Sequence, residues 1–338
     1  MRFIKLLGSA YMMLFNKGDD EMKRTMSYGK DDVWVYRTYA APLTGVRSIP
    51  ESAFTGRSNI LFGMNVKVAV EGDAFLTSFK DGDNTLVVAT DSMKNFILKH
   101  AGDYEGSTQE GFLEFVARRF LETYPHMSAI DISGEQIPFD ELPVPTKGRF
   151  EPSPLVFRYS LNEQSVASVE VKRSGEEIII ADHLSSLKGL KLLKVRGSSF
   201  FGFVKDEYTT LPESYDRPLF IFLNIGWRYN DFEGARGSTK DGYVAAEQVR
   251  DIAYTVFHEE NSPSIQNLIY RIGLRILKRF SQLVEVRFES NNRTWETILD
   301  DIPASQEGKV FTEPRPPFGF QCFYMTREDL ENPGETRT

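Results

Sequence analysis

The chain has 338 residues, enough for about two domains, and its 41% hydrophobic and 26% charged residues are typical of a globular protein. A formal net charge of −8, with no long basic run, disfavours nucleic acid and anionic membranes as partners. The single cysteine, Cys322, excludes an intrachain disulfide and fits the reducing cytoplasm. The four histidines are widely spaced and give a metal site little local support.

The two ends of the chain differ from the rest in composition. The start, MRFIKLLGSAYMMLF, has a basic beginning and an apolar middle, which is a weak likeness to a signal peptide. The charged stretch that follows, NKGDDEMKR, has no small-residue cleavage site. We therefore expect residues 1–23 to be a disordered lead-in and residues 329–338 to be a polar tail. No stretch is long enough to span a bilayer.

Strand and helix patterns alternate along the chain between these ends. Alternating apolar residues predict strands near residues 33, 60–70, 86, 165, 191, 219, 283 and 318. Apolar residues at positions i, i+3, i+4 and i+7 predict helices over about 92–101, 112–120, 249–257 and 265–276. Each half thus has strands, then two helices, then more strands. This order is a weak internal repeat with a period near 155 residues.

The repeat predicts an α+β fold of two tandem units, over residues 24–183 and 184–328. Each unit would be an antiparallel sheet with a pair of helices on one face. The other face and the edges of such a sheet remain uncovered, so we expect the chain to associate with copies of itself.

The stretch TLVVATDSMKNF, from Thr85 to Phe96, contains three helix-capping residues side by side. A helix needs one cap, and Thr90 or Asp91 could supply it while Asp91 favours the helix dipole. The surplus polar groups could instead face a ligand at the start of the helix. The local sequence leaves both interpretations open.

Several longer motifs follow one another along the chain. They are YGK at 28–30, VVATDSMKN at 87–95, DEYTTL at 206–211, VAAEQVRDIA at 244–253, SIQNLIY at 264–270 and TEPRPPFGFQ at 312–321. From about Arg24 to about Glu328 the chain resembles the urate oxidase family, above all bacterial uricases of the Bacillus type. The resemblance implies the tunnelling fold (T-fold), with two tandem units per chain, in homotetramers that enclose a tunnel and have active sites at subunit interfaces.

The resemblance also implies a reaction. Members of the family oxidise urate with O₂ and water to 5-hydroxyisourate and hydrogen peroxide, without metal, flavin or other cofactor. Thr90 and Asp91 match residues that reach across the interface into the neighbouring subunit's site. Lys30 matches the family's base, which works through the hydroxyl of Thr90. Without the resemblance, Lys30 would be read as a solvated charge at a strand start.

Five further residues match the family's urate-binding positions. Arg217 matches the guanidinium that grips urate, Gln266 matches the amide that pairs with the opposite edge, and Phe200 matches the ring stacked on the purine. The backbone of Ile265 is expected to add a hydrogen bond. Asn292 matches the asparagine that holds O₂ or water over the ring.

Each of these residues also has an ordinary structural interpretation. Arg217 could form a surface ion pair with Asp216, Phe200 could belong to the core, Gln266 could begin a helix and Asn292 could lie in a turn. The chain also departs from the family pattern, because Thr294 stands where many members have a histidine that extends the relay. A threonine cannot serve as a base near neutral pH. Another T-fold enzyme acting on a purine or pterin, or a non-catalytic urate-binding relative, therefore remain alternative functions.

Overall fold

The computed structural model describes residues 26–146, 148–160, 162–239, 241–293, 296–299, 310–312 and 316–331. The predicted lead-in at 1–23, Thr294 and most of the predicted tail lie outside these residues. The described start of the tail belongs to a short helix, α7 (Glu328–Glu331).

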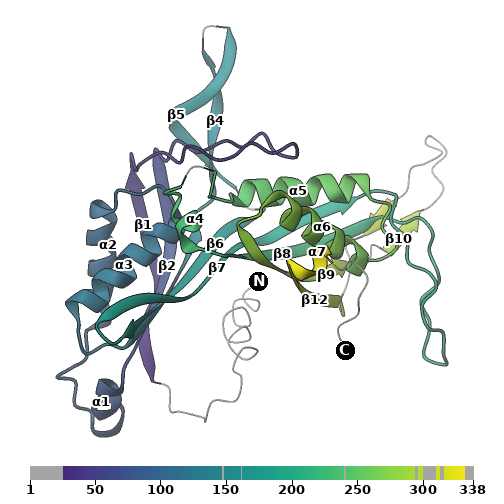
Figure 1. The fold of residues 1–338 in the computed structure, drawn as a ribbon. Helices are drawn as coiled ribbons and strands as arrows, with labels where there is room; N and C mark the ends of the chain where they lie inside the picture. The colour runs from purple at the N-terminus through teal and green to yellow at the C-terminus, as the bar shows by residue number, and fades with distance from the viewer. Residues whose placement is uncertain are drawn as a thin grey trace.

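An antiparallel sheet of eight strands forms the centre of the molecule (Figure 1). In spatial order its strands are β1 (Ser27–Thr38), β2 (Leu61–Glu71), β3 (Ala129–Gln136), β6 (Gln164–Ser174), β7 (Glu177–Lys194), β8 (Leu219–Tyr229), β9 (Leu283–Arg293) and β12 (Gly319–Thr326). The sheet is open, with β1 and β12 at its edges. The division predicted between residues 183 and 184 falls inside β7, which pairs with β6 on one side and with β8 on the other.

Four long helices cover one face of this sheet in two pairs. They are α2 (Thr90–Asp103), α3 (Gln109–Thr123), α5 (Ala246–Glu259) and α6 (Ile265–Arg279). Figure 1 shows the first pair over one end of the sheet and the second pair over the other. The predicted α+β fold of antiparallel sheets with paired helices is therefore confirmed.

The two helix pairs repeat each other closely. Helices α2 and α5 begin at residues 90 and 246, and α3 and α6 begin at 109 and 265, so both separations are 156 residues. Thr108 and Ser264 cap α3 and α6, and each side chain accepts a hydrogen bond from the amide three residues later. Helices α2 and α5 both have an alanine at the N-cap position. The observed spacing agrees with the predicted period near 155 residues.

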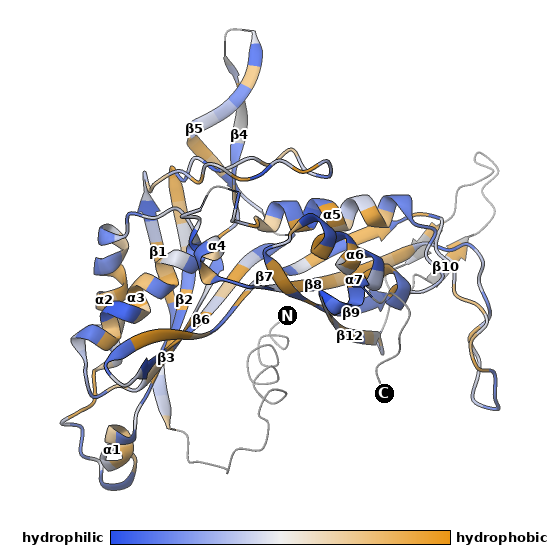
Figure 2. Ribbon diagram, viewed as in Figure 1, coloured by the Kyte–Doolittle hydropathy of each residue, from blue (hydrophilic) through white to orange (hydrophobic). Residues whose placement is uncertain are grey.

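The apolar residues that gave the helical pattern are buried between the helices and the sheet. On α3 they include Phe112, Val116 and Phe120, and on α6 Ile272 and Ile276, all fully buried. Burying each such side chain contributes about 1.5–3 kcal/mol. Figure 2 shows that α5 carries both hydrophilic and hydrophobic residues, as expected for a helix packed on one side.

The strand predicted near residue 86 is wrong. Residues 85–89 form a turn and an irregular segment, because side chains take the place of a neighbouring strand. The amide of Val88 donates to the Tyr28 hydroxyl over 2.8 Å, and the carbonyl of Leu86 accepts from the His126 ring over 2.9 Å. Periodicity alone could not show that these backbone groups already had partners.

The remaining elements are short or peripheral. They are η2 (Asp73–Phe75), α1 (Leu76–Asp81), α4 (Phe232–Arg236) and two hairpins, β4 (Phe139–Thr146) with β5 (Arg149–Tyr159) and β10 (Glu296–Leu299) with β11 (Val310–Thr312). The β4–β5 hairpin projects away from the body (Figure 1). Within the described residues, no helix is long and apolar enough to cross a membrane.

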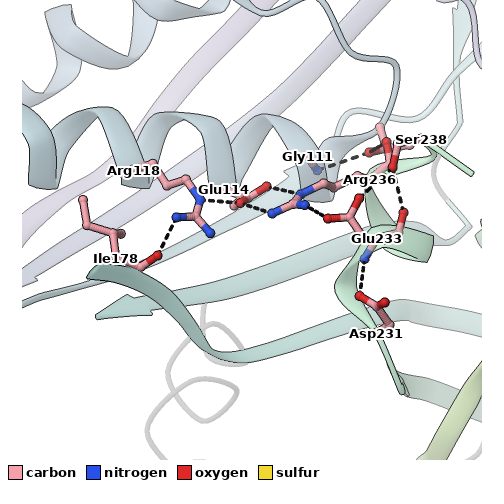
Figure 3. A network of polar contacts seen from close by, with 9 residues as sticks. Gly111, Glu114, Arg118, Ile178, Asp231, Glu233, Arg236 and Ser238 are labelled. Carbon is pink, nitrogen blue, oxygen red and sulfur yellow. Dashed lines mark hydrogen bonds and ion pairs between the residues drawn. The ribbon is translucent and has the colours of Figure 1, made fainter. Parts of the chain in front are cut away.

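Ion pairs join the two halves of the chain above the middle of the sheet. Glu114 on α3 accepts from Arg118 on the same helix and from Arg236 on α4, whose Nε lies 2.6 Å from the carboxylate (Figure 3). Arg236 also pairs with Glu233, and Arg118 reaches the carbonyl of Ile178 on β7. Glu114 is buried, so this network fixes α3 of the first half against α4 of the second.

Candidate active site

Two of the predicted site residues, Lys30 on β1 and Thr90 on α2, lie close to each other. The hydrogen bond between Tyr28 and Val88 fixes the start of β1 against the segment before α2. Lys30 and Thr90 each follow two residues later, and both are half-buried. The pairing of β1 with β2 is interrupted directly after Lys30, where Asp32 has a φ of 56°. Such β-bulges often redirect side chains next to functional sites.

The three polar residues at the start of α2 do not cap it. Ala89 occupies the N-cap position, so the prediction of Thr90 or Asp91 as the cap is wrong. The exposed carboxylate of Asp91 instead accepts from Lys94, over 2.6 Å, and from Asn95, over 3.1 Å. In the described part of the chain, the Thr90 hydroxyl has no hydrogen-bond partner. Its hydroxyl is therefore available to another molecule.

Asp91 is electrostatically linked to Lys30. The hydrogen bond from Lys94 is the largest cause that holds the pKa of Asp91 below its usual value, and the charge of Lys30 acts in the same direction. The structure thus brings Lys30, Thr90 and Asp91 together as a first cluster, at the β1 edge of the sheet.

A second cluster forms around the loop between β7 and β8. Phe200 and Ser214 exchange two backbone hydrogen bonds across this loop, and the amide of Arg217 donates to the carbonyl of Ser198. Ser198 also forms a parallel bridge with Ser262, just before α6. These bonds hold the base of the loop against the start of α6.

Arg217 lies at the base of this loop, and none of the described carboxylates pairs with it. Its guanidinium is centred 5.5 Å from the Phe200 ring. Asp216 accepts from the Gly197 amide over 2.6 Å, and no ion pair between Arg217 and Asp216 is found among the described residues, so that alternative is wrong. The Arg217 Nε is buried and has no hydrogen-bond partner among the residues that the structure describes, and burial lowers the pKa of the guanidinium. A buried donor without a partner is costly, which points to a ligand that accepts from it.

Ile265 and Gln266 are the first two residues of α6. The Ser264 side chain caps the amide of Asn267, which leaves the two preceding amides among the donors that a helix cannot satisfy by itself. The Ile265 side chain is buried, whereas that of Gln266 is exposed. An exposed amide side chain beside free backbone donors suits a ligand with both acceptors and donors on one edge.

Asn292, near the end of β9, lies on the strand that packs beneath the start of α6, where Gln266 is located. Gly273 on α6 packs closely against Phe288 on β9, because a Cβ atom at Gly273 would lie only 3.0 Å from the Phe288 ring. This contact places α6 against β9. Gln266 lies seven helical residues before this contact, about 10 Å, and Asn292 lies four strand residues beyond it, about 13 Å. Since α6 and β9 run in opposite directions, the start of α6 meets the end of β9. Phe200, Arg217, Ile265, Gln266 and Asn292 therefore form the second cluster.

The two clusters lie far apart in one chain. Six inter-strand spacings of about 4.8 Å separate β1 from β9, which is on the order of 30 Å. Figure 1 likewise shows α2 and α6 over opposite ends of the sheet. A single chain thus does not bring Lys30, Thr90 and Asp91 together with the other five predicted residues.

Sequence reasoning missed one contact of this second cluster. The Gln321 side chain on β12 donates to the Asn292 Oδ1 over 3.2 Å, and Ser290 donates to Gln321 over 2.7 Å. Gln321 is the last residue of the motif TEPRPPFGFQ, but that motif gave no indication of its partner. Among the described residues, no group of three or more His, Cys, Asp or Glu side chains is placed to hold a metal ion.

A family model described as uricase matches residues 26–170 and 183–321, well over half of the chain. The chain belongs to the uricase family. Among its relatives, a uricase of Haloferax volcanii is 57% identical over 308 residues, which are 90% of this chain and 99% of the relative.

Two Bacillus relatives of this uricase-family chain are longer. The uric acid degradation bifunctional protein PucL of Bacillus subtilis is 57% identical over 319 residues, which cover 94% of this chain. A bifunctional protein of the same description from Bacillus sp. TB-90 is 55% identical over 323 residues. The chain spans 64% of the length of each of these two relatives.

Solved structures of uricase-family proteins have the same fold. The uricase of Bacillus fastidious matches with a TM-score of 0.89 at 54% identity, covering 92% of this chain and 96% of that one. The urate oxidase of Bacillus sp. TB-90 matches with a TM-score of 0.86 at 57% identity, covering 89% and 99%.

Proposed function

We propose that this uricase-family chain is a urate oxidase, which oxidises urate with O₂ and water to 5-hydroxyisourate and hydrogen peroxide. The observation that carries the proposal is the Arg217 guanidinium, which lies over Phe200 beside the start of α6, with a buried Nε that has no partner within the described part of the chain. Relatives named uricase or urate oxidase support the choice of urate as substrate.

The second cluster suits a flat anion with polar groups around its rim. Arg217 offers a planar fork of N–H donors to oxygen and nitrogen acceptors on one edge of urate. Gln266 offers one donor and one acceptor to the opposite edge, and the Ile265 amide adds a donor. The Phe200 ring offers a stacking face. These four groups would fix the purine in one orientation.

We propose that a second copy of the chain supplies Lys30, Thr90 and Asp91, within a homotetramer that encloses a tunnel. The chain already contains a matching arrangement in its middle. Offset by 156 residues, Gln266 corresponds to Glu110 and Asp91 corresponds to Glu247. Arg57 pairs with Glu247. Burial lowers the pKa of Arg57, but the charges of nearby groups, among them Glu247 and Glu110, raise it above its usual value, so the starts of α3 and α5 meet within one chain. The start of α6 and the start of α2 can meet in the same way between two chains.

We also propose a division into two T-fold units, 24–183 and 184–328, which the two matched segments of the family model support. The family model matches the chain in two segments, and each segment contains one pair of the repeated helices. We also propose a cytoplasmic location, which rests on the single cysteine of the sequence.

The reaction requires removal of a proton and transfer of two electrons. In the proposed mechanism, Lys30 accepts a proton from urate through the Thr90 hydroxyl, which acts as a relay. The deprotonated ring gives two electrons to O₂, which takes up two protons and leaves as hydrogen peroxide. The oxygen of water forms the new C–O bond at C5, and Asn292 holds O₂ or water over the ring. We expect no metal or prosthetic group to take part.

Loss of urate absorbance near 293 nm, together with formation of hydrogen peroxide, tests the proposal directly. The assay uses purified protein with urate and O₂, without added cofactor and with a chelator present. Both signals are expected from assembled protein. Urate binding without peroxide would instead identify a non-catalytic relative. Stoichiometric zinc together with no urate turnover would favour another T-fold enzyme.

A further inference from the structure

The Asn292 side chain is held on one side only. Its Oδ1 accepts from the Gln321 Nε2 over 3.2 Å, and the Gln321 Oε1 accepts from the buried Ser290 hydroxyl over 2.7 Å. The three side chains lie on adjacent strands, where Gln321 is paired with Ser290 and Gly319 with Asn292. In the described residues, the Asn292 Nδ2 has no hydrogen-bond partner.

We propose that Gln321 is a positioning residue, which turns the Asn292 amide so that its NH₂ group faces the bound oxygen species. This proposal rests on the proposed urate oxidase function. An amide has an acceptor end and a donor end, so occupying the Oδ1 leaves the two N–H donors for the ligand. Ser290 fixes Gln321 in turn, because its hydroxyl donates to the Gln321 oxygen and leaves the Gln321 NH₂ for Asn292.

The donor end is the one that the reaction needs. O₂ gains negative charge as urate oxidises, and a fixed N–H donor stabilises charge that develops during a reaction. The acceptor end would repel the same charge. Gly319 leaves room for this contact, because a Cβ atom there would lie 3.1 Å from the Asn292 Oδ1 and 3.7 Å from the Gln321 Nε2. The local backbone thus accommodates the pair.

Gln321→Met tests the proposal, since methionine has a similar length but cannot donate to Asn292. We expect kcat for urate to fall about tenfold with KM within about twofold, because Asn292 can then turn either end toward the oxygen. In an Asn292→Ala background the same change should have no further effect on kcat, whereas an independent structural role would make the two losses multiply. Gln164→Met, a half-buried strand residue of the first half, is the matched control.

Gln321→Glu gives a second readout that a structural role would not move. An ionised carboxylate only accepts, so it would attract the NH₂ group and turn the Asn292 oxygen toward the site. A protonated carboxyl can donate again, so the ratio of mutant to wild-type kcat should rise at least fivefold as the pH falls from 8 to 5.5.

The outcomes separate the two proposals. Wild-type protein that does not consume urate would overturn the proposed function and this inference with it. Active wild-type protein, with Gln321→Met at wild-type kcat or with multiplying losses in the double variant, would overturn the inference alone. If either Gln321 variant does not fold, Ser290→Ala replaces it: we expect a threefold or larger loss of kcat at unchanged KM, and an unchanged kcat would overturn the inference.

Discussion

Helices α3 and α6 begin in the same way in the two halves of the chain, yet their surroundings differ. The start of α3 is covered by side chains of the same chain, and we call it the closed start; the start of α6 is exposed, and we call it the open start. Thr108 and Ser264 cap them with equivalent hydrogen bonds. In the first turn of α3, Glu110 is buried and accepts from the Ser185 hydroxyl over 2.7 Å. At the equivalent place on α6, Gln266 is exposed. Glu110 and Gln266 are therefore one difference between the two copies of this structural unit.

The surroundings of the closed start leave little room for a large ligand. The Tyr243 hydroxyl donates to Glu110 over 3.3 Å, and Arg57 pairs with Glu247 at the start of α5. The cavity beside them measures about 80 Å³ and is also lined by Ser165 and Arg250. Small-molecule sites usually measure about 300–1,000 Å³. Side chains of the same chain thus fill the position that, at α6, we propose for urate.

Gln266→Glu would place at the open start a glutamate like Glu110 of the closed start, and we expect the largest effect on activity from this change. The carboxylate loses the donor that pairs with urate and repels the anion, so kcat/KM for urate should fall by about 10³- to 10⁴-fold. Steady-state consumption of urate at 293 nm measures the loss. Gln164→Glu makes the same exchange on a strand of the first half and should stay within twofold of wild type. A Gln266→Glu variant within tenfold of wild type would remove Gln266 from the urate site.

Complementation between two inactive variants tests whether each site needs two chains. Lys30→Met removes the base and Arg217→Ala removes the clamp, so each should lower kcat/KM by about 10²- to 10³-fold. Co-assembly in equal amounts should restore activity at about a quarter of the sites, those that combine an intact residue from each partner. Urate consumption by co-expressed protein is the measurement. A mixture no more active than either variant alone would indicate that both residues serve a site within one chain.

The sequence predicted the elements better than their partners. The periodic stripes at Phe112 and Ile269 were sufficient to place α3 and α6, because those faces are buried. Capping chemistry predicted a helix start near Thr90, but the cap is Ala89, and the geometry of the preceding turn decided that. Such features depend on contacts between distant residues, which a local pattern does not contain.

The candidate site shows the same limit. Resemblance named Arg217 and Asn292 as binding residues, but neither the missing carboxylate partner of Arg217 nor the contact of Asn292 with Gln321 is visible in local sequence. Both depend on which strands become neighbours. The distance between the two clusters also follows from strand order rather than from any motif.

Glu114 is expected to contribute to stability in a way that depends on pH. Burial raises its pKa, but hydrogen bonds from Arg236 and Arg118 outweigh burial, and the net pKa lies below the usual 4.5. Its contribution is therefore fully present above pH 4.5 and is lost as the pH falls through the lower, folded-state pKa. Glu114→Gln should lower the free energy of unfolding by about 2–3 kcal/mol at pH 7 and by less near pH 3.

Urea unfolding of wild type and Glu114→Gln across pH 3–7 checks this expectation. The exposed Glu122 on the same helix, which pairs with Arg119 over 3.4 Å, supplies the control, and Glu122→Gln should change stability by less than about 0.5 kcal/mol. A gap between wild type and Glu114→Gln that stays constant over this pH range would contradict the pairing as its cause.

Glu110→Gln makes the reverse exchange, at the closed start, and we expect the smallest effect from it. Urate kinetics should stay within about twofold of wild type, because Glu110 lies outside the proposed site, and stability at pH 5 should change by about 1 kcal/mol or less.

Burial raises the pKa of Glu110 despite its hydrogen bonds, so ionising it costs folding free energy as the pH rises. A glutamine never ionises. The stability of Glu110→Gln relative to wild type should therefore improve from pH 5 to pH 8, opposite in sign to Glu114→Gln, and urea unfolding at both values would show it. A relative loss over that range would mean that the ionised Glu110 holds the starts of α3 and α5 together through Arg57.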